Sequence, residues 1–198
     1  TVTKAHISDG KAQAVICNSG NANTCNADGI EKAEMMCQLV AKATGLKATD
    51  FVVASTGVIG QPLDITPIEN HIEELNAKLS YDGSFDCASA IMTTDTHSKE
   101  VAFEIEIGGK TVTVGGMCKG SGMIHPNMGT MLGFITTDAD IDQTLLQKAL
   151  RETIEDTFNM VSVDGDTSTN DTVVVLANGM AGNAKITSED EDYNTLLT

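Results

Sequence analysis

Residues 12–57, AQAVICNSGNANTCNADGIEKAEMMCQLVAKATGLKATDFVVASTG, contain the pattern that decides the fold. Two short, β-branched apolar runs, Ala12–Cys17 and Phe51–Ser55, are typical of buried strands. Between them, a capping box that begins at Asp28 predicts the start of a helix, and Gly45 predicts its end. A strand, a helix and a second strand in this order indicate a mixed α/β fold.

The rest of the chain continues this alternation of helix and strand signals. Pro67 next to Thr66 predicts the start of a second helix, and Asp140 opens the longest one. Gly108-Gly109 separates two apolar runs and predicts a two-residue hairpin turn. The predicted buried helix faces are Ile30, Ala33, Cys37 and Val40, then Ile68, Ile72, Leu75 and Leu79, then Ile141, Leu145, Leu146, Leu150, Ile154 and Phe158. The further predicted strands are Val101–Ile107, Lys110–Met117, Met131–Thr137 and Asp171–Ala177, the last of them central in its sheet.

The composition is that of an acidic, folded protein. Over 198 residues the hydrophobic fraction is 41% and the formal net charge is −16. This charge argues against nucleic acid and anionic membranes as partners, because both repel an acidic surface. The chain contains no internal repeat, low-complexity tract or Pro-rich linker. We therefore expect residues 1–198 to form a single-domain portion of a larger protein.

Cysteine usage and hydropathy bear on the cellular compartment. The five cysteines form no C-x-x-C pair, and their odd number and wide spacing favour reduced, buried thiols over disulfides or a zinc site. They are Cys17, Cys25, Cys37, Cys87 and Cys118. No apolar run reaches the length of a membrane span, and the first residues lack the apolar core of a signal peptide. These features together predict the cytoplasm.

Two polar segments follow predicted strands. Ser55-Thr56-Gly57 can present a hydroxyl and an unhindered backbone N–H to one small site, which are the two donors that an oxyanion hole needs. The alternative is a plain turn at the glycine. Asn18–Asn26 (NSGNANTCN) either contributes to a site or forms a tight turn whose Asn side chains bond their own backbone.

Residues 119–132, KGSGMIHPNMGTML, form the most unusual segment. Gly129-Thr130 leads directly into a predicted strand. A threonine held at a strand start, after a residue without Cβ, suits attack on its own preceding peptide bond. Once that bond opens, the new α-amine of Thr130 lies beside the hydroxyl and can act as its base. Self-cleavage before Thr130 is therefore one hypothesis for this segment.

Five segments, in this order, resemble those of the ornithine acetyltransferases (glutamate N-acetyltransferases) of arginine biosynthesis. They are NSGNAN (18–23), STGVIGQPLDI (55–65), TTDT (93–96), KGSGMIHPNMGTML (119–132) and VSVDGDTSTNDTV (161–173). The motifs extend over nearly the whole chain, and a chance match to several long motifs in order is implausible. The resemblance implies a mixed, layered αββα-type fold like that of the self-processing ornithine acetyltransferase and DmpA-like proteins, within a longer protein.

The resemblance also implies roles for individual residues. Thr130 matches the residue before which family members cleave themselves, here at Gly129-Thr130, and which then carries the acetyl group as nucleophile. Thr56 and Gly57 match the pair that stabilises the oxyanion.

Two more positions match contacts to the amino-acid substrate, Thr93 and Lys119. An ammonium at Lys119 suits a substrate carboxylate inside an acidic protein. The alternative for Lys119 is a solvated loop lysine.

The implied reaction moves acetyl from N2-acetyl-L-ornithine to L-glutamate through an acetyl-Thr130 intermediate, and some members of the family also accept acetyl-CoA. The resemblance implies pairing of the two cleaved halves and a homo-oligomer of such pairs, with no cofactor and no metal. Two alternatives stay open: a self-processing aminopeptidase with water as the acceptor, and a catalytically inactive fragment that keeps the fold.

The chain departs from the family pattern near the cleavage site. Gly129 replaces the usual Ala, which relaxes the backbone before Thr130. His125 replaces a residue that is commonly small and uncharged. It is either a surface imidazole or a group whose titration makes maturation pH-dependent. Residues 164–168 begin like a calcium loop, but later positions do not fit, so we expect a polar loop there.

Overall fold

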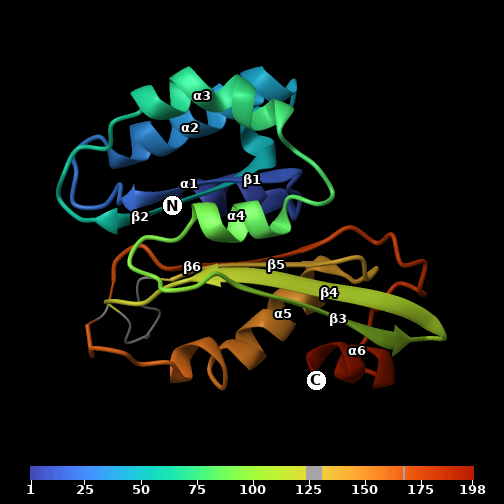
Figure 1. The fold of residues 1–198 in the computed structure, drawn as a ribbon. Helices are drawn as coiled ribbons and strands as arrows, with labels where there is room; N and C mark the ends of the chain where they lie inside the picture. The colour runs from blue at the N-terminus through green and yellow to red at the C-terminus, as the bar shows by residue number, and fades with distance from the viewer. Residues whose placement is uncertain (124–130, 167) are drawn as a thin grey trace. The chain divides into compact units, whose positions relative to one another are not determined.

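The computed structural model describes residues 1–123, 131–166 and 168–198. The chain divides into two compact units (Figure 1). Thr1–Ser98 and Thr169–Asp171 form the N-terminal unit, and Lys99–Ser168 and Thr172–Thr198 form the C-terminal unit. Each unit combines helices with strands, which confirms the predicted mixed α/β class. That the whole chain belongs to one domain of a larger protein stays a prediction.

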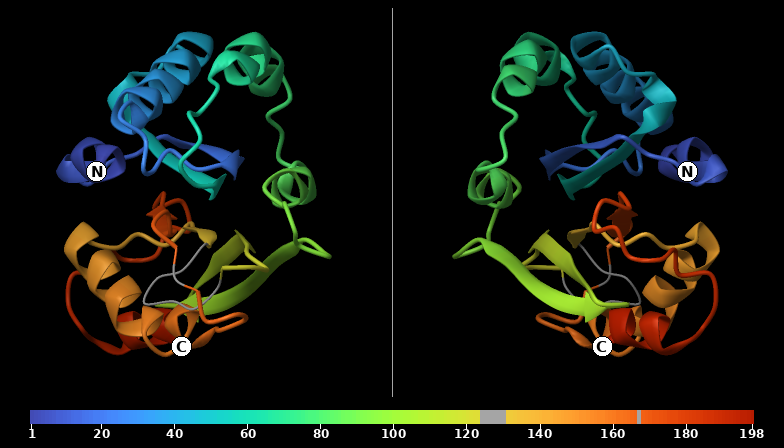
Figure 2. Two further views of the ribbon diagram at one scale, coloured as in Figure 1. Left: turned by 90° about the vertical axis from the view of Figure 1, so that its left-hand side faces the viewer. Right: turned by 90° about the vertical axis from the view of Figure 1, so that its right-hand side faces the viewer.

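The N-terminal unit is built on two parallel strands. β1 (Ala14–Asn21) pairs in register with β2 (Phe51–Val58), and α2 (Gly29–Thr44) connects them. Parallel strands need such a crossover, since no tight turn can join them. Figures 1 and 2 show α2 and α3 (Thr66–Ala77) on the same face of this pair. The core between the helices and the strands includes Ile16, Ala33, Met36, Cys37, Val40, Phe51, Val53, Leu63, Ile65 and Ile72.

Short helices complete this unit. α1 (Val2–His6) runs into a 3₁₀ turn at Ile7–Asp9, and a second 3₁₀ turn, Ala48–Asp50, precedes β2. α4 (Ser84–Ala90) follows α3. The sequence did not predict α1 or α4, because five to seven residues are too few to show a helical period.

The C-terminal unit contains a four-stranded sheet in the order β3-β4-β5-β6. A tight turn joins β3 (Lys99–Ile107) to β4 (Lys110–Lys119), and both turn residues have positive φ, 57° at Gly108 and 73° at Gly109. Glycine adopts such angles without steric cost, which confirms the predicted hairpin.

A second crossover completes the C-terminal unit. β5 (Leu132–Thr137) and β6 (Thr172–Ala177) are parallel, with α5 (Gln143–Ile154) and a 3₁₀ turn, Phe158–Met160, between them. α5 and α6 (Glu191–Leu197) lie on one face of the sheet (Figures 1 and 2). The core under these helices comprises Ile107, Val112, Ala139, Ile141, Ala149, Ile186 and Tyr193. No helix in the described ranges combines the length and the apolar character that a membrane crossing requires.

The structure corrects several predicted boundaries. β1 extends through Asn18–Asn21 and β2 through Thr56–Val58, so both polar segments begin inside the strands. The reason is their mutual pairing, which continues to Asn21 opposite Val58. The helix predicted to be the longest, α5, has 12 residues and is shorter than α2, which has 16. It begins at Gln143 instead of Asp140, because the carboxylate of Asp142 caps it by accepting the Thr144 N–H at 2.9 Å.

Other predictions were wrong about exposure or position. β6 is an edge strand of the described sheet and not a central one, since β5 is its single neighbour there. Three residues assigned to buried helix faces are exposed: Ile30 by 61%, Leu75 by 54% and Leu79 by 72%. Leu79 lies beyond the end of α3, and Ile30 lies in the first turn of α2, where the packed stripe has not yet begun.

The cysteines divide by burial, so the prediction of uniformly buried thiols was only partly right. Cys25 and Cys87 are exposed, Cys37 is buried and Cys17 is half-buried. Burial, and to a smaller extent the Glu34 carboxylate, raises the pKa of Cys37 to about 12. Burial, and then the neighbouring Cys87, raises the pKa of Cys17 to about 11.

We expect iodoacetamide at pH 8 to modify Cys25 and Cys87 well before Cys17 and Cys37. The thiolate is the reactive form, and the raised pKa values keep the last two thiols protonated from neutral pH up to about pH 10. Peptide mass spectrometry over a time course measures the order, and the urea-unfolded protein, in which all sites react, is the control. Equal rates at Cys37 and Cys25 in the folded protein would contradict this.

Candidate functional site

The outer edge of β2 is satisfied by side chains instead of another strand. Thr3 Oγ1 of α1 donates to the Val53 carbonyl at 2.6 Å and accepts the Val53 N–H at 3.0 Å. His6 Nδ1 lies 3.1 Å from the Phe51 carbonyl oxygen, to which it donates. Phe51 and Val53 therefore direct their backbone groups away from β1.

The same row of outward backbone groups reaches the candidate site. In an extended strand, alternate residues direct their N–H and C=O to the same side. The Ser55 carbonyl fits this pattern, because it accepts a hydrogen bond from Asn170 Nδ2 at 2.8 Å. Gly57 is the next member of the row, and by this alternation we expect its N–H on the outer edge as well.

Residue 57 has to be glycine, because the backbones of β1 and β2 approach closely there. Its φ is +126°, and a Cβ at this residue would lie 2.2 Å from the carbonyl carbon of Gly20, its partner on β1. No other residue type fits without moving one strand. The prediction of a plain turn at this glycine was wrong, since it pairs within the parallel ladder.

The side chain of Thr56 is buried and its hydroxyl is unpaired. Ser55 Oγ lies 3.6 Å from Met36 Sδ of α2, so Thr56 points to the opposite face of the strand pair. Thr56 is 0% exposed, and its Oγ1 has no hydrogen-bond partner among the described residues. An unsatisfied buried hydroxyl costs free energy and is rare in folded proteins. A buried hydroxyl of this kind next to Gly57 favours the hypothesis that Thr56 and Gly57 donate hydrogen bonds to a ligand.

The amide side chains of Asn18–Asn26 bond nearby backbone groups, in line with the alternative to a role in a site. Asn18 Nδ2 donates to the Asn21 carbonyl at 2.6 Å within the end of β1, and in the loop that follows Asn23 Nδ2 donates to the Gly29 carbonyl at 3.0 Å. Asn26 Nδ2 donates to the carbonyl of Gln61 at 2.6 Å. These bonds make the loop a rigid neighbour of the candidate site.

Asn170 joins this loop to β2. Its amide bonds Asn23 Oδ1 at 2.8 Å as well as the Ser55 carbonyl, and it accepts a hydrogen bond from the Thr24 hydroxyl. Sequence reasoning did not single out Asn170. Its signal was weak: one Asn within a polar motif that precedes a strand, some 115 residues from Ser55.

Thr93 belongs to the same unit as Thr56. It is exposed, and its N–H donates to the carboxylate of buried Asp95 at 3.3 Å. The preceding turn is attached to β1, where Ser19 Oγ donates to the Ile91 carbonyl at 2.5 Å. Ser19 pairs with Thr56 in the ladder. The position of the Thr93 loop therefore depends on the strand pair.

Lys119 lies in the C-terminal unit, at the end of β4. It is 4% exposed and pairs with Leu132 at the start of β5, so the alternative of a solvated loop lysine was wrong. The Asp164 carboxylate accepts the Met123 N–H at 2.6 Å and restrains the chain beyond Lys119. This contact supports the expected polar loop at residues 164–168, except for residue 167, which is outside the described ranges.

Gly129, Thr130 and His125 lie outside the described residues. Met131, which follows Thr130 in sequence, is 8% exposed, and its carbonyl accepts the N–H of Thr172 at 3.0 Å. The chain immediately after the predicted nucleophile is thus attached to the start of β6.

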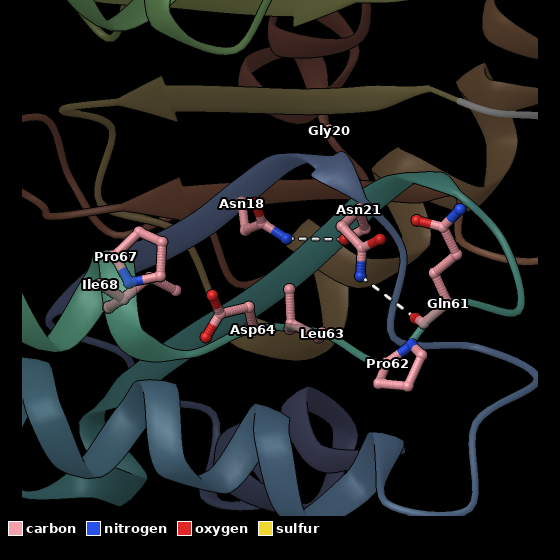
Figure 3. A pocket seen from close by; sticks show the side chains of 9 residues that line it. All are labelled: Asn18, Gly20, Asn21, Gln61, Pro62, Leu63, Asp64, Pro67 and Ile68. Carbon is pink, nitrogen blue, oxygen red and sulfur yellow. Dashed lines mark hydrogen bonds between the residues drawn. The ribbon is translucent and has the colours of Figure 1, made fainter.

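A pocket of about 370 Å³ opens on the other face of the β1–β2 pair (Figure 3). It is lined by Asn18, Gly20, Asn21, Gln61, Pro62, Leu63, Asp64, Pro67 and Ile68. Asn18 pairs with Ser55 and shares its helix-covered face, so the pocket does not adjoin the Thr56 hydroxyl. Asp64 accepts the Thr66 N–H at 3.0 Å, which lowers the pKa of this carboxyl and keeps it ionised at neutral pH. Within the described ranges, no group of three His, Cys, Asp or Glu side chains is placed to hold a metal.

Comparison with known proteins identifies the family. All 198 residues match the model described as the ArgJ family. The chain belongs to the ArgJ family. The resemblance that the five sequence motifs indicated is thereby confirmed.

Curated relatives within the ArgJ family agree over most of the chain. It is 53% identical over 193 residues to an arginine biosynthesis bifunctional protein ArgJ from Symbiobacterium thermophilum, covering 97% of this chain and 48% of the relative. It is 50% identical over 190 residues to a glutamate N-acetyltransferase from Methanocaldococcus jannaschii, covering 94% and 47%. The chain therefore spans about half the length of these curated relatives.

Solved ArgJ-family structures support the fold. The bifunctional protein ArgJ from Bacillus halodurans matches with a TM-score of 0.58 and 41% identity, over 64% of this chain and 67% of that one. An ornithine acetyltransferase from Mycobacterium tuberculosis, solved with ornithine, matches with a TM-score of 0.52 and 30% identity, over 63% and 67%.

We expect Gly57→Ala to destabilise the protein by about 1–3 kcal/mol more than Gly20→Ala, because its Cβ overlaps the facing backbone. Gly20 is a matched control: its φ of +136° imposes similar backbone strain, but nothing lies within 4 Å of the position that a Cβ would take there. Urea unfolding of the two variants measures the difference, and equal losses would contradict the close approach.

Proposed function

We propose that the protein transfers acetyl from N2-acetylornithine to glutamate through an acetyl-Thr130 intermediate. The observation that carries this proposal is the hydroxyl of Thr56, next to Gly57: it is buried and has no hydrogen-bond partner among the described residues. Two such donors stabilise the oxyanion that forms when a nucleophile attacks an acetyl carbonyl. Family membership supports the substrates, since relatives are named as a glutamate N-acetyltransferase and an ornithine acetyltransferase.

The nucleophile would arise by self-cleavage between Gly129 and Thr130. The Thr130 hydroxyl attacks the Gly129 carbonyl carbon, the peptide C–N bond breaks, and water hydrolyses the resulting ester. The free α-amine then accepts the hydroxyl proton when Thr130 attacks the acetamide carbonyl of acetylornithine. Ornithine leaves with that proton, glutamate enters, and its amine takes the acetyl group by the reverse steps.

The donors at Thr56 and Gly57 act at the moment when negative charge develops. In the resting protein the Thr56 hydroxyl has no acceptor among the described residues, so binding the oxyanion requires no existing hydrogen bond to break. Rigidity adds to this effect, because the close contact of Gly57 with Gly20 restrains the backbone that carries the second donor.

Lys119 and Thr93 are proposed to bind the amino-acid substrates. The buried ammonium of Lys119 suits the α-carboxylate that ornithine and glutamate share. Use of acetyl-CoA as a second donor, pairing of cleaved halves, a homo-oligomer of such pairs and a cytoplasmic location remain predictions that follow from the resemblance.

Intact mass of the full-length protein, before and after incubation with N-acetylornithine, tests the nucleophile. We expect two fragments broken between Gly129 and Thr130, with one acetyl group added to the fragment that begins at Thr130. Thr130→Ala should give one uncleaved mass and no adduct. An adduct on any other residue, or release of free amino acids from peptides without transfer to glutamate, would overturn the proposal.

Thr56→Val separates the catalytic role of the hydroxyl from any structural one. The exchange keeps the shape and removes a buried polar atom without a partner, so thermal stability should stay the same or rise. Loss of one oxyanion donor should lower kcat by about 100- to 1000-fold. Steady-state kinetics and a thermal melt on the same preparation measure both, and an unchanged kcat would remove Thr56 from the mechanism.

A further inference from the structure

Asn170 brings a side chain from far along the sequence to the backbone of Ser55 in the N-terminal unit. Residues 169–171 are part of this unit although the chain on both sides belongs to the other. The Asn170 amide reaches the peptide that leads into Thr56. Nothing in the motif, the family match or the proposed chemistry gives this residue a task.

The amide of Asn170 uses all of its hydrogen-bonding capacity. An Asn side chain has two N–H donors and two acceptor lone pairs. Nδ2 donates to the Ser55 carbonyl and to Asn23 Oδ1, each at 2.8 Å. Oδ1 accepts from the hydroxyls of Thr24 and Thr169, the latter at 3.0 Å. The orientation of the amide is determined, because a carbonyl oxygen such as that of Ser55 can only accept.

The network that holds Asn170 is itself anchored. Asn23 Nδ2 donates to the Gly29 carbonyl at the start of α2, so Asn23 Oδ1 is directed at Asn170. Gly29 lies so close to the Asn23 backbone that a Cβ would be 1.9 Å from the Asn23 carbonyl oxygen. The Asn170 amide that donates to the Ser55 carbonyl is therefore held by Asn23, which is itself bonded to the start of α2.

The contact has an electrostatic consequence for its neighbours. The Ser55 carbonyl is directed to the outer edge of β2, where strand alternation leads us to expect the Gly57 N–H, one step away in the row. An unpaired carbonyl oxygen there would repel an oxyanion bound at Gly57, and it would leave the Ser55–Thr56 peptide free to rotate. The Asn170 donor offsets the negative end of that carbonyl and fixes the plane of the peptide.

We propose that Asn170 is a positioning residue: its donor to the Ser55 carbonyl aligns the Thr56 hydroxyl and the Gly57 N–H for the oxyanion. The inference rests on the proposed acetyl transfer. In this role Asn170 acts through the Ser55–Thr56 peptide and not by contact with the substrate. Misalignment of a catalytic group by about 1 Å costs about 100-fold in rate, which sets the upper scale of the effect.

Asn170→Ala and Asn170→Asp in the full-length protein test the proposal. We expect kcat for acetyl transfer to fall about 10- to 100-fold in both variants, with the KM for glutamate changed less than about twofold, because alignment matters mainly in the transition state. Asp keeps the acceptor for Thr24 and Thr169 but loses the donor to Ser55. A kcat restored by Asp would therefore overturn the proposal, and so would a raised KM with kcat unchanged.

Asn183→Ala is the matched control. Asn183 is buried in the C-terminal unit and also uses its amide on backbone groups, donating to the Asp140 and Ala184 carbonyls and accepting the Asp140 N–H. We expect this variant to melt at a lower temperature with kcat unchanged. A kcat loss equal to that of Asn170→Ala would show a general effect of lost stability and would overturn the positioning role.

Two further outcomes are distinguishable. An inactive wild-type protein would overturn the proposed function and this inference with it, whereas an active wild type with an unchanged kcat in Asn170→Ala would overturn the inference alone. If Asn170→Ala does not fold, Thr24→Ala takes its place, since it removes one anchor of the same amide. We expect about a threefold loss of kcat there at unchanged KM, and an unchanged kcat would overturn the inference.

Discussion

The parallel pairing of β1 with β2, at the distance that two facing glycines permit, is the constraint on which the candidate site depends. Gly20 lies opposite Gly57, and a Cβ at Gly57 would overlap the Gly20 backbone, whereas a Cβ at Gly20 would meet open space. The pairing carries both polar segments into the ladder, so Ser19 lies beside Thr56. A polar loop after each strand would otherwise be free to move. The close approach therefore converts two loop-like sequences into one rigid surface.

At the outer edge of β2, side chains instead of another strand bond the backbone N–H and C=O groups. α1 supplies Thr3 and His6 to the first two outward residues, and the distant Asn170 supplies the third contact at Ser55. An unpaired edge usually invites another chain, and short side-chain caps prevent this. Ser55 is the last residue of this edge for which the described residues show such a side-chain contact, and Gly57 follows it in the row.

The C-terminal unit places its predicted site residues by similar means. Lys119 is buried at the point where β4 meets β5, and Asp164 restrains the segment that follows. Met131, directly after the predicted nucleophile, is attached to the start of β6. In both units, then, the predicted site residues Thr56 and Lys119 lie at strand ends, where regular pairing determines the backbone and the chain can still present a side chain.

The sequence by itself determined the elements that rest on local patterns. The two strand–helix–strand units, the hairpin at Gly108-Gly109 and the family followed from apolar periodicity, glycine chemistry and long ordered motifs. Helix ends were less certain, because a cap such as Asp142 is distinguished from Asp140 only by its contact with the Thr144 N–H. For the site, the sequence indicated Thr56 and Gly57 as donors, and that role stays a prediction.

Tertiary structure alone decided which groups these residues meet. That Ser55–Gly57 lies inside a ladder, that the Thr56 hydroxyl is buried without a partner, and that Asn170 reaches Ser55 all depend on segments far apart in the chain. The edge position of β6 is of the same kind, since it depends on which strands are neighbours and not on its own apolar residues. Local sequence encodes backbone preference and the face of each side chain. Partners across many residues are selected by packing, which no short window of sequence contains.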